Sequence, residues 1–350
     1  MNRTIIDVLK KGSLELFHSD MLRWLMDETE EHRHKRAFLN LLATTLSTKG
    51  FPNLSDALKA SPTYTAITEF LHRQERTDIE IQFPNHQPFV IENKTKSLGT
   101  IEQLDRYAAY GTQPIALGFT AALFPTQTTY PVLDYHDILA ALNQLVPAND
   151  RWGTLISEYR DFLTRELNIL DHITHRATHD NAPSTPVIQK EEQLNYRDND
   201  KRVLQYYYLA GFRQHLTSNG IPETNWELGK HEISGVWIAT KIPLALTPTF
   251  SNLTTRHSAT LCLQLELHNA LFSTDDKPAG EFQLRTTSGN AAALATDCRT
   301  HLPQTTGQWF PCTRAGRTNK LFGAPLYETD LAYDRLEDRL RAFAQPFCAL

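Results

Sequence analysis

The chain has 350 residues, which is long enough for one large domain or two ordinary ones. Of these residues, 41% are hydrophobic and 21% are charged. This composition is typical of a globular protein and excludes a largely disordered chain. The formal net charge of −5 excludes a uniformly basic surface that coats nucleic acid, but it leaves room for a local basic cleft.

The sequence also bears on compartment and metal content. It has no run of 18 or more apolar residues, so we expect no contact with a membrane. Charged residues, Asp7 among them, interrupt the opening segment, which indicates a cytoplasmic protein without a signal peptide. The four cysteines are Cys262, Cys298, Cys312 and Cys348. Their spacing contains no CxxC pair and predicts neither a zinc ribbon nor a disulfide framework.

The first half of the chain alternates between helical and strand patterns. Apolar residues at helical spacing predict helix over residues 4–48, with a charged break at 30–36. The elements predicted next are strands Thr63–Leu71, Asp78–Phe83 and Phe89–Thr95, a helix over 100–110, strands Pro114–Thr120 and Tyr130–Tyr135, and a helix over Asp137–Leu145. This order predicts an α/β domain with a mixed sheet.

The second half begins with a predicted helix over 153–176 and a proline-rich linker over 181–186. The elements predicted beyond it are a helix over 189–218, strands Glu232–Leu244, Ala259–Asn269 and Gly280–Thr286, and a closing helix Leu331–Phe343. The linker divides the chain into a first domain, 1–180, and a smaller α+β domain, 187–350. The second domain carries no motif, and target recognition, dimerisation and docking of a partner subunit all remain open roles for it.

Carboxylates and lysines alternate with apolar residues on two neighbouring strand segments. In the first segment the apolar residues share one face, which leaves Asp78 and Glu80 on the other. In the second segment the same alternation leaves Glu92, Lys94 and Lys96 opposite the apolar face. If the apolar faces pair, an even register places Asp78 beside Glu92 or Lys94.

Such a cluster suits the hydrolysis of a phosphodiester. Carboxylates can hold a metal that activates water and neutralises phosphate charge, and a lysine can stabilise the nucleophile or the developing charge. Because Mg²⁺ prefers oxygen ligands and keeps several waters, two or three carboxylates suffice. The competing interpretation is an ordinary hairpin whose Glu and Lys residues alternate on a solvated face.

Two further features favour a functional cluster. Glu69 lies upstream among apolar neighbours, where a carboxylate needs a partner. Gln103 and Tyr107 lie one helical turn apart, beside the apolar stripe of the predicted helix. We expect both to border the same cleft as Asp78. In the alternative, Tyr107 is an ordinary core residue and Gln103 faces solvent.

Taken together, these residues resemble the PD-(D/E)XK nuclease superfamily. The matching pieces are Glu69, Arg76-Thr77-Asp78, Glu92-Asn93-Lys94 and Gln103-x-x-x-Tyr107, the last similar to an exonuclease-related branch. The segment from Glu15 through His18-Ser19 to Leu25 resembles the Glu-x-x-His-Ser-x-x-Leu-x-Trp-Leu start of a bacterial subfamily. Thr77 replaces a proline found in many members, which affects only the start of the strand. The resemblance covers residues 15–107 and implies a restriction-endonuclease-like mixed sheet flanked by helices, extending to about residue 150.

The resemblance also implies a role for each matched residue. The implied catalytic set is Asp78, Glu92, Lys94, Glu69, Gln103 and Tyr107. The implied metal ligands are Asp78, Glu92, the Asn93 carbonyl and Glu15. Glu69 and Glu15 would be auxiliary acids, and Gln103 and Tyr107 would orient the site or contact nucleic acid. The implied cofactor is Mg²⁺, with Mn²⁺ as a substitute.

Other groups of residues carry weaker signals, each with an ordinary structural explanation. They are His18 with Ser19, the helically spaced His172, His175 and His179, the aromatic run Tyr206–Tyr208, and the basic residues Arg314, Arg317 and Lys320. The histidines lack the acidic or cysteine partners of a closed metal site. The tyrosines could stack on bases or lie in a core, and the basic residues could contact phosphate or belong to a solvated loop.

The leading hypothesis is therefore a metal-dependent nuclease that acts on DNA, and the resemblance implies a prokaryotic, restriction-like or antiviral defence setting. The alternative is a protein that binds nucleic acid or a partner on a nuclease-like fold without turnover. RNA is a further possible substrate, and the chain could act as a homodimer or with a partner subunit.

Overall fold

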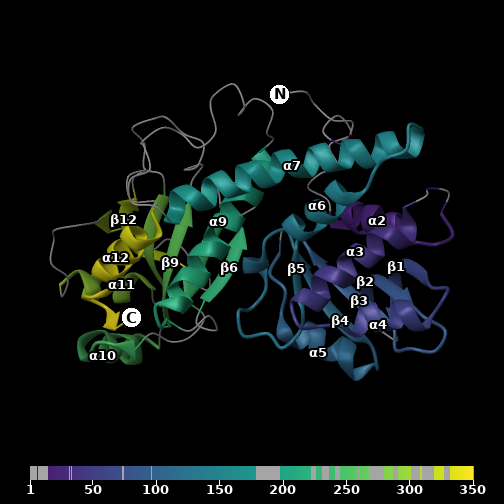
Figure 1. The fold of residues 1–350 in the computed structure, drawn as a ribbon. Helices are drawn as coiled ribbons and strands as arrows, with labels where there is room; N and C mark the ends of the chain where they lie inside the picture. The colour runs from purple at the N-terminus through teal and green to yellow at the C-terminus, as the bar shows by residue number, and fades with distance from the viewer. Residues whose placement is uncertain are drawn as a thin grey trace. The chain divides into compact units, whose positions relative to one another are not determined.

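The computed structural model describes residues 6, 15–30, 32, 34–72, 75–95, 97–178, 198–221, 226–230, 236–240, 245–258, 260–267, 280–286, 291–300, 308–309, 319–326 and 332–349 (Figure 1). The chain divides into two compact units, Met1–Ile169 and Leu170–Leu350, and the division falls within helix α7 (Arg151–Thr178). The proline-rich linker lies outside the described residues. Within those residues, no helix has both the length and the apolar character needed to cross a membrane.

The first unit is built around a five-stranded mixed sheet. Its strands are β1 (Thr65–His72), β2 (Glu75–Gln82), β3 (Phe89–Lys94), β4 (Gln113–Gly118) and β5 (Val132–Asp134), in that spatial order. Strands β1, β2 and β3 are antiparallel, whereas β4 and β5 run parallel to β3. Its further helices are α2 (Glu15–Met26), α3 (Lys35–Thr48), α4 (Asn53–Ala60), α5 (Ile101–Ala109), η1 (Ala121–Leu123) and α6 (Tyr135–Gln144). The predicted α/β domain with a mixed sheet is confirmed.

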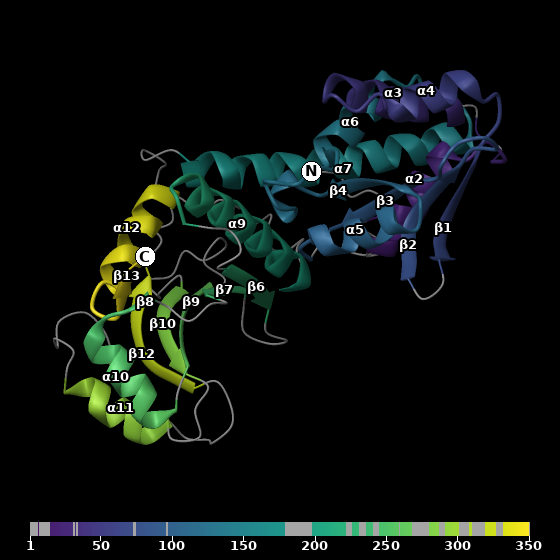
Figure 2. The same cartoon turned by 90° about the horizontal axis from the view of Figure 1, so that it is seen from below.

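Helices cover both faces of this sheet. Figure 2 shows α3 and α4 on one side of it and α5 on the other. Thr100 caps the start of helix α5, because its side chain accepts a hydrogen bond from the Gln103 backbone N–H. The helix buries Leu104 and Tyr107. Helix α6 begins with a capping box between Asp134 and Asp137. These caps satisfy backbone donors of the first helical turns and fix where each helix starts.

The β2–β3 hairpin has the even register that the sequence predicts. Ile79 pairs with Ile91, and Ile81 with Phe89. The polar face of the hairpin is nevertheless covered, because Glu80, Glu92 and Lys94 are only 0%, 1% and 9% exposed. The competing interpretation of a solvated polar face is therefore wrong. Charged groups buried to this degree need partners.

The sequence patterns miss some elements of the first unit or misplace their ends. Helix α4 is not predicted, because its buried Leu54, Ala57 and Leu58 span little more than one turn. Strand β2 begins at Glu75, before the predicted start at Asp78, and β5 is shorter than predicted at both ends. Element boundaries are the part of a sequence pattern that carries least information.

The second unit contains a six-stranded antiparallel sheet in the order β11-β12-β10-β9-β7-β6 and a two-stranded sheet, β13-β8. Its strands are β6 (Trp226–Lys230), β7 (Val236–Thr240), β8 (Ala245–Leu246), β9 (Leu261–Leu267), β10 (Gly280–Thr286), β11 (Gln308–Trp309), β12 (Asn319–Leu326) and β13 (Cys348–Ala349). Its helices are α9 (Asp198–Ser218), α10 (Pro248–His257), α11 (Ala291–Arg299) and α12 (Tyr333–Ala344). Of the predicted strand over 232–244, the described residues form β7, and the other residues of that range lie outside the described part of the chain. Strands β6, β11, β12 and β13 and helices α10 and α11 were not predicted.

Candidate active site

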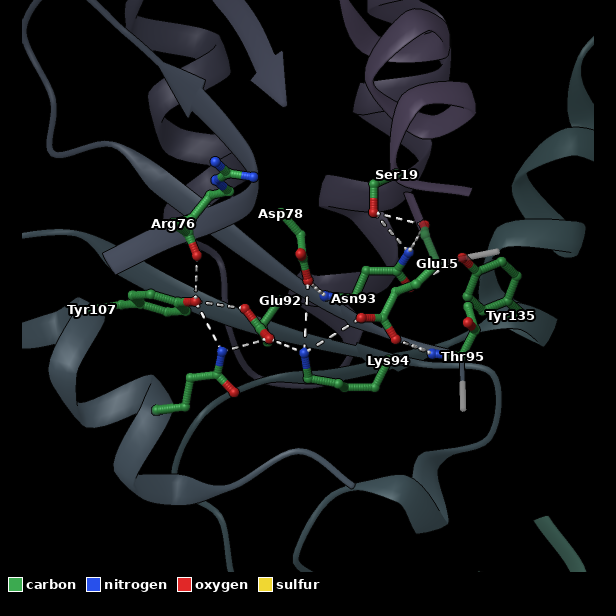
Figure 3. Close-up of polar contacts among 11 residues, drawn as sticks. Glu15, Ser19, Arg76, Asp78, Glu92, Asn93, Lys94, Thr95, Tyr107 and Tyr135 are labelled. Carbon is green, nitrogen blue, oxygen red and sulfur yellow. Dashed lines mark hydrogen bonds and ion pairs between the residues drawn. The ribbon is translucent and has the colours of Figure 1, made fainter. Parts of the chain in front are cut away.

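A cluster of three carboxylates surrounds the ammonium group of Lys94 at the end of β3 (Figure 3). Lys94 Nζ contacts a Glu92 carboxylate oxygen and lies 3.9 Å from Asp78 Oδ2 and 3.7 Å from Glu15 Oε1. Asp78 comes from β2, Glu92 and Lys94 from β3, and Glu15 from the first turn of α2. We call these four residues the carboxylate cluster. With every member ionised, the cluster carries a net negative charge.

Glu92 is held in place by two side chains of helix α5. Gln103 Nε2 donates to Glu92 Oε1 at 2.7 Å, and the Tyr107 hydroxyl donates to Glu92 Oε2 at 2.7 Å. Gln103 Nε2 also lies 3.0 Å from the Tyr107 oxygen, which can accept its second hydrogen. The predicted position of Gln103 and Tyr107 beside the cluster is confirmed. Tyr107 is a core residue as well, because it is 1% exposed and only its hydroxyl reaches the site.

Asp78 is fixed by the backbone of the facing strand. The Asn93 N–H donates to Asp78 Oδ2 at 2.7 Å. Burial raises the pKa of Asp78 to about 7, and the Glu92 carboxylate adds to the rise, while Lys94 and the Asn93 N–H oppose it. A carboxylate with this pKa accepts either a proton or a metal ion near neutral pH.

Lys94 keeps its charge despite its burial. Burial by itself lowers the pKa of Lys94, but Glu92, Asp78 and Glu15 outweigh it and hold that pKa above its ordinary value. Glu15 is itself oriented, because its Oε2 accepts from the Thr95 backbone N–H at 3.1 Å. The cluster is therefore assembled from groups that the backbone and neighbouring side chains already point toward one another.

The donor set of the cluster suits a hard divalent cation, since carboxylate oxygens are the ligands that Mg²⁺ prefers. As the side chains stand, no three His, Cys, Asp or Glu residues of the described part of the chain are arranged to hold a metal ion. The contacts of Lys94 explain this, because its ammonium group lies where the carboxylate oxygens of Asp78, Glu92 and Glu15 converge.

Glu69 is placed differently from the expectation. It is exposed, and its Oε1 accepts from Arg76 Nη1 at 3.1 Å, so its partner is a surface arginine. Its φ of 52° lies in the left-handed region, which costs a non-glycine residue about 1 kcal/mol or more. The β1–β2 ladder has no pair at Glu69, where it would face Asp78. Glu69 therefore has the partner that its apolar neighbours predict, but this partner is an exposed arginine and not a member of the carboxylate cluster.

Most of the weaker signals have structural explanations. Tyr206, Tyr207 and Tyr208 are buried in α9, which excludes stacking on bases in this conformation. His172 is exposed on α7. Lys320 belongs to β12 and forms an ion pair with Glu281, which corrects the predicted loop. The residues Arg314, Arg317, His179 and Lys96 and the His175 side chain lie outside the described residues.

His18 and Ser19 of α2 are buried in polar contacts beside the cluster. His18 Nδ1 lies 2.9 Å from the Tyr159 hydroxyl, and Ser19 Oγ accepts from Asn93 Nδ2 at 3.0 Å. Sequence reasoning did not identify Tyr135, whose hydroxyl donates to Asn93 Oδ1 at 3.1 Å. A tyrosine at the start of a helix gives no signal of this contact.

Comparison with protein families agrees with this geometry. A family model described as the PD-(D/E)XK nuclease superfamily matches residues 4–115, from before α2 into β4. The matched segment includes the whole carboxylate cluster and helix α5. Comparisons with curated proteins and with solved structures gave no match. The mixed sheet flanked by helices is consistent with a restriction-endonuclease-like fold, and the family model places residues 4–115, about a third of the chain, in the PD-(D/E)XK nuclease superfamily.

Proposed function

We propose that this protein is a divalent-metal-dependent nuclease that hydrolyses phosphodiester bonds of DNA. The observation that carries the proposal is the carboxylate cluster, in which Asp78, Glu92 and Glu15 gather around the buried Lys94 ammonium. A structural ion pair needs only one carboxylate, and each further buried carboxylate costs desolvation and repulsion. Three of them in one place indicate a site shaped for a cation that binds with its substrate.

Asp78 and Glu92 would hold the cation from neighbouring strands, with the Asn93 carbonyl and Glu15 as further ligands. Mg²⁺ is the cation proposed, and Mn²⁺ is its substitute, because both accept oxygen ligands. When bound, the cation supplies charge neutralisation on the phosphate and a coordinated water of lowered pKa.

The protein's own residues would carry the remaining work. Lys94, protonated at neutral pH, would donate to the attacking water or to a phosphate oxygen as negative charge develops there. Water would attack phosphorus opposite the leaving oxygen and the P–O bond to that oxygen would break, while the proton that the water loses passes to solvent and the leaving oxygen takes one up from solvent. Gln103 and Tyr107 hold both oxygens of Glu92, which keeps the carboxylate oriented through the reaction.

The proposal also assigns a role to each of the two domains. Residues 1–180 would form the nuclease domain, and residues 187–350 would serve target recognition, dimerisation or docking of a partner subunit. A role in prokaryotic genome defence rests on the resemblance of the opening segment alone. Protection of cells against phage by the natural chain but not by Glu92→Gln would test that role.

The function is tested by incubating purified protein with Mg²⁺, Mn²⁺ or Ca²⁺ and with labelled DNA or RNA. We expect cleavage of DNA with Mg²⁺ and Mn²⁺. Ca²⁺ is expected to bind without supporting turnover, because it is larger and activates water less well. Cleavage of RNA alone would contradict the substrate, and the absence of metal-dependent cleavage would contradict the enzyme.

A matched pair of variants separates the site from general effects on the protein. Glu92→Gln keeps the size of the side chain but removes the charge, so we expect cleavage to fall at least about 100-fold. Glu102→Gln makes the same change on the exposed first turn of α5, one residue before Gln103. We expect Glu102→Gln to cleave at the natural rate, and equal losses in both variants would contradict the assignment.

A further inference from the structure

A chain of buried polar side chains leads away from the carboxylate cluster through Asn93. Because residues of a strand alternate between faces, the Asn93 side chain points away from those of Glu92 and Lys94. Its Nδ2 donates to Ser19 Oγ at 3.0 Å, and its Oδ1 accepts from the Tyr135 hydroxyl at 3.1 Å (Figure 3). Helix α2 and helix α6 thus hold the two ends of one amide.

This chain of hydrogen-bonded side chains continues to helix α7. Tyr135 also hydrogen-bonds with Tyr159, whose oxygen lies 2.9 Å from His18 Nδ1. All five members, His18, Ser19, Asn93, Tyr135 and Tyr159, are at most 1% exposed. Buried polar groups of this kind are costly unless each finds a partner, and a fully paired network fixes one arrangement of its members.

The directions of the hydrogen bonds at the Asn93 side-chain amide follow from chemistry. The Glu15 carbonyl, 3.4 Å from Asn93 Nδ2, can only accept, which sets the orientation of the amide. The Asn93 oxygen then accepts from the Tyr135 hydroxyl.

We propose that this buried chain positions the active site by clamping Asn93. The inference rests on the proposed nuclease function. Asn93 is the link because its backbone N–H holds Asp78 at 2.7 Å, while its side chain is held by Ser19 and Tyr135. A change in the side-chain contacts therefore moves the backbone that orients Asp78 and presents the Asn93 carbonyl. Tyr135, Tyr159, His18 and Ser19 are positioning residues that touch neither metal nor substrate.

The decisive variant is Tyr135→Phe, which removes the hydroxyl from Asn93 but keeps the ring stacked on Phe119 at 5.0 Å. The matched control is Tyr64→Phe. Tyr64 is also buried, and its hydroxyl donates to the Met26 carbonyl at 2.7 Å, so this change removes a comparable hydrogen bond without touching Asn93. Both variants are compared with the natural full-length chain for unfolding temperature, Mg²⁺ dependence, kcat and KM.

We expect Tyr135→Phe to raise the Mg²⁺ concentration for half-maximal activity, or to lower kcat, by about 10-fold, with KM for DNA unchanged. Tyr64→Phe is expected to change neither kinetic quantity, although both variants lose a similar amount of stability. Equal kinetics in the two variants would show that the hydrogen-bonded side chains only fill the core, and would overturn the proposal. If Tyr135→Phe does not fold, Tyr159→Phe breaks the chain one bond further away and is judged by the same criteria.

A second readout does not depend on catalysis. Hydrogen exchange of the Asn93 backbone N–H is expected to be faster in Tyr135→Phe than in Tyr64→Phe. The reason is that a loosened Asn93 holds its backbone hydrogen bond to Asp78 less closely. Unchanged exchange would overturn the proposed positioning of Asn93 even if the protein cleaves DNA. If the natural protein cleaves nothing, the proposed function fails, and this measurement alone decides the inference.

Discussion

Removing the negative charge of Asp78 should stabilise the metal-free protein while it abolishes cleavage. Asp78→Asn keeps an oxygen that can accept from the Asn93 N–H, so the hydrogen bond at 2.7 Å is retained. The lost charge is one that burial and Glu92 disfavour. Groups arranged for catalysis commonly reduce the stability of the fold that carries them.

The magnitude follows from the pKa of Asp78, which burial raises from 3.8 to about 7. Because the folded protein holds the proton more tightly than the unfolded chain, ionisation of Asp78 destabilises the fold. This effect grows as pH rises from about 4 to about 7 and is complete above it, with an upper bound of about 4 kcal/mol. Asp78 remains 27% exposed, so water screens part of the effect and we expect about 1–3 kcal/mol.

The assay is denaturation of the full chain in EDTA between pH 5 and pH 8.5, with the natural protein and Asp78→Asn in parallel. Each kcal/mol corresponds to about 2–4 °C in unfolding temperature for a unit of this size. The exposed Asp56, paired with Lys59 in α4, supplies the control Asp56→Asn, which should change stability by no more than about 0.5 kcal/mol.

Two results would refute this reasoning. The first is an Asp78→Asn variant that is less stable than the natural protein at pH 8. The second is a difference in stability that does not shrink toward pH 5, since protonated Asp78 and asparagine are then both neutral. Millimolar Mg²⁺ should narrow or reverse the difference, because the metal binds the natural site more tightly and stabilises it.

Three further predictions concern single side chains around the cluster. Lys94→Ala should abolish cleavage while circular dichroism shows a folded chain, and normal single-turnover cleavage in this variant would remove Lys94 from the mechanism. Tyr107→Phe should weaken Mg²⁺ binding about 10-fold in calorimetric titration, because Glu92 loses a donor at 2.7 Å; an unchanged affinity would show that Gln103 orients Glu92 unaided. Arg76→Gln should raise KM for DNA with kcat unchanged, because the Arg76 guanidinium is exposed beside the site and can contact phosphate. The same change should make the slope of log affinity against log salt concentration shallower by about 1, and an unchanged slope would exclude a phosphate contact.

Local patterns were sufficient to predict the hairpin and its neighbouring helix. Alternation of apolar and polar residues on two segments joined by a short turn leaves one register in which both apolar faces pair, and Ile79 does face Ile91. The four-residue spacing of Gln103 and Tyr107 places them on one helical stripe, which the structure turns toward Glu92. Both results depend on periodicities of the backbone itself.

Patterns of the same kind failed to predict features that depend on an unusual backbone conformation or on a partner distant in the sequence. Nothing in the residues around Glu69 signals its left-handed φ. With this backbone conformation the Glu69 side chain is exposed and pairs with Arg76. In the second unit, short strands such as β11 and β13 carry too few residues to show a period.

The sequence by itself therefore determined the type of sheet and the chemistry of the residues that approach one another across the hairpin. Only the tertiary structure decided how those residues are held. Tyr135 lies 42 positions from Asn93, and Tyr159 lies 141 positions from His18, so no local period relates them. Their contacts arise because the fold brings side chains of α2, α6 and α7 together beside Asn93, and burial then requires each polar group to find a partner wherever the fold provides one.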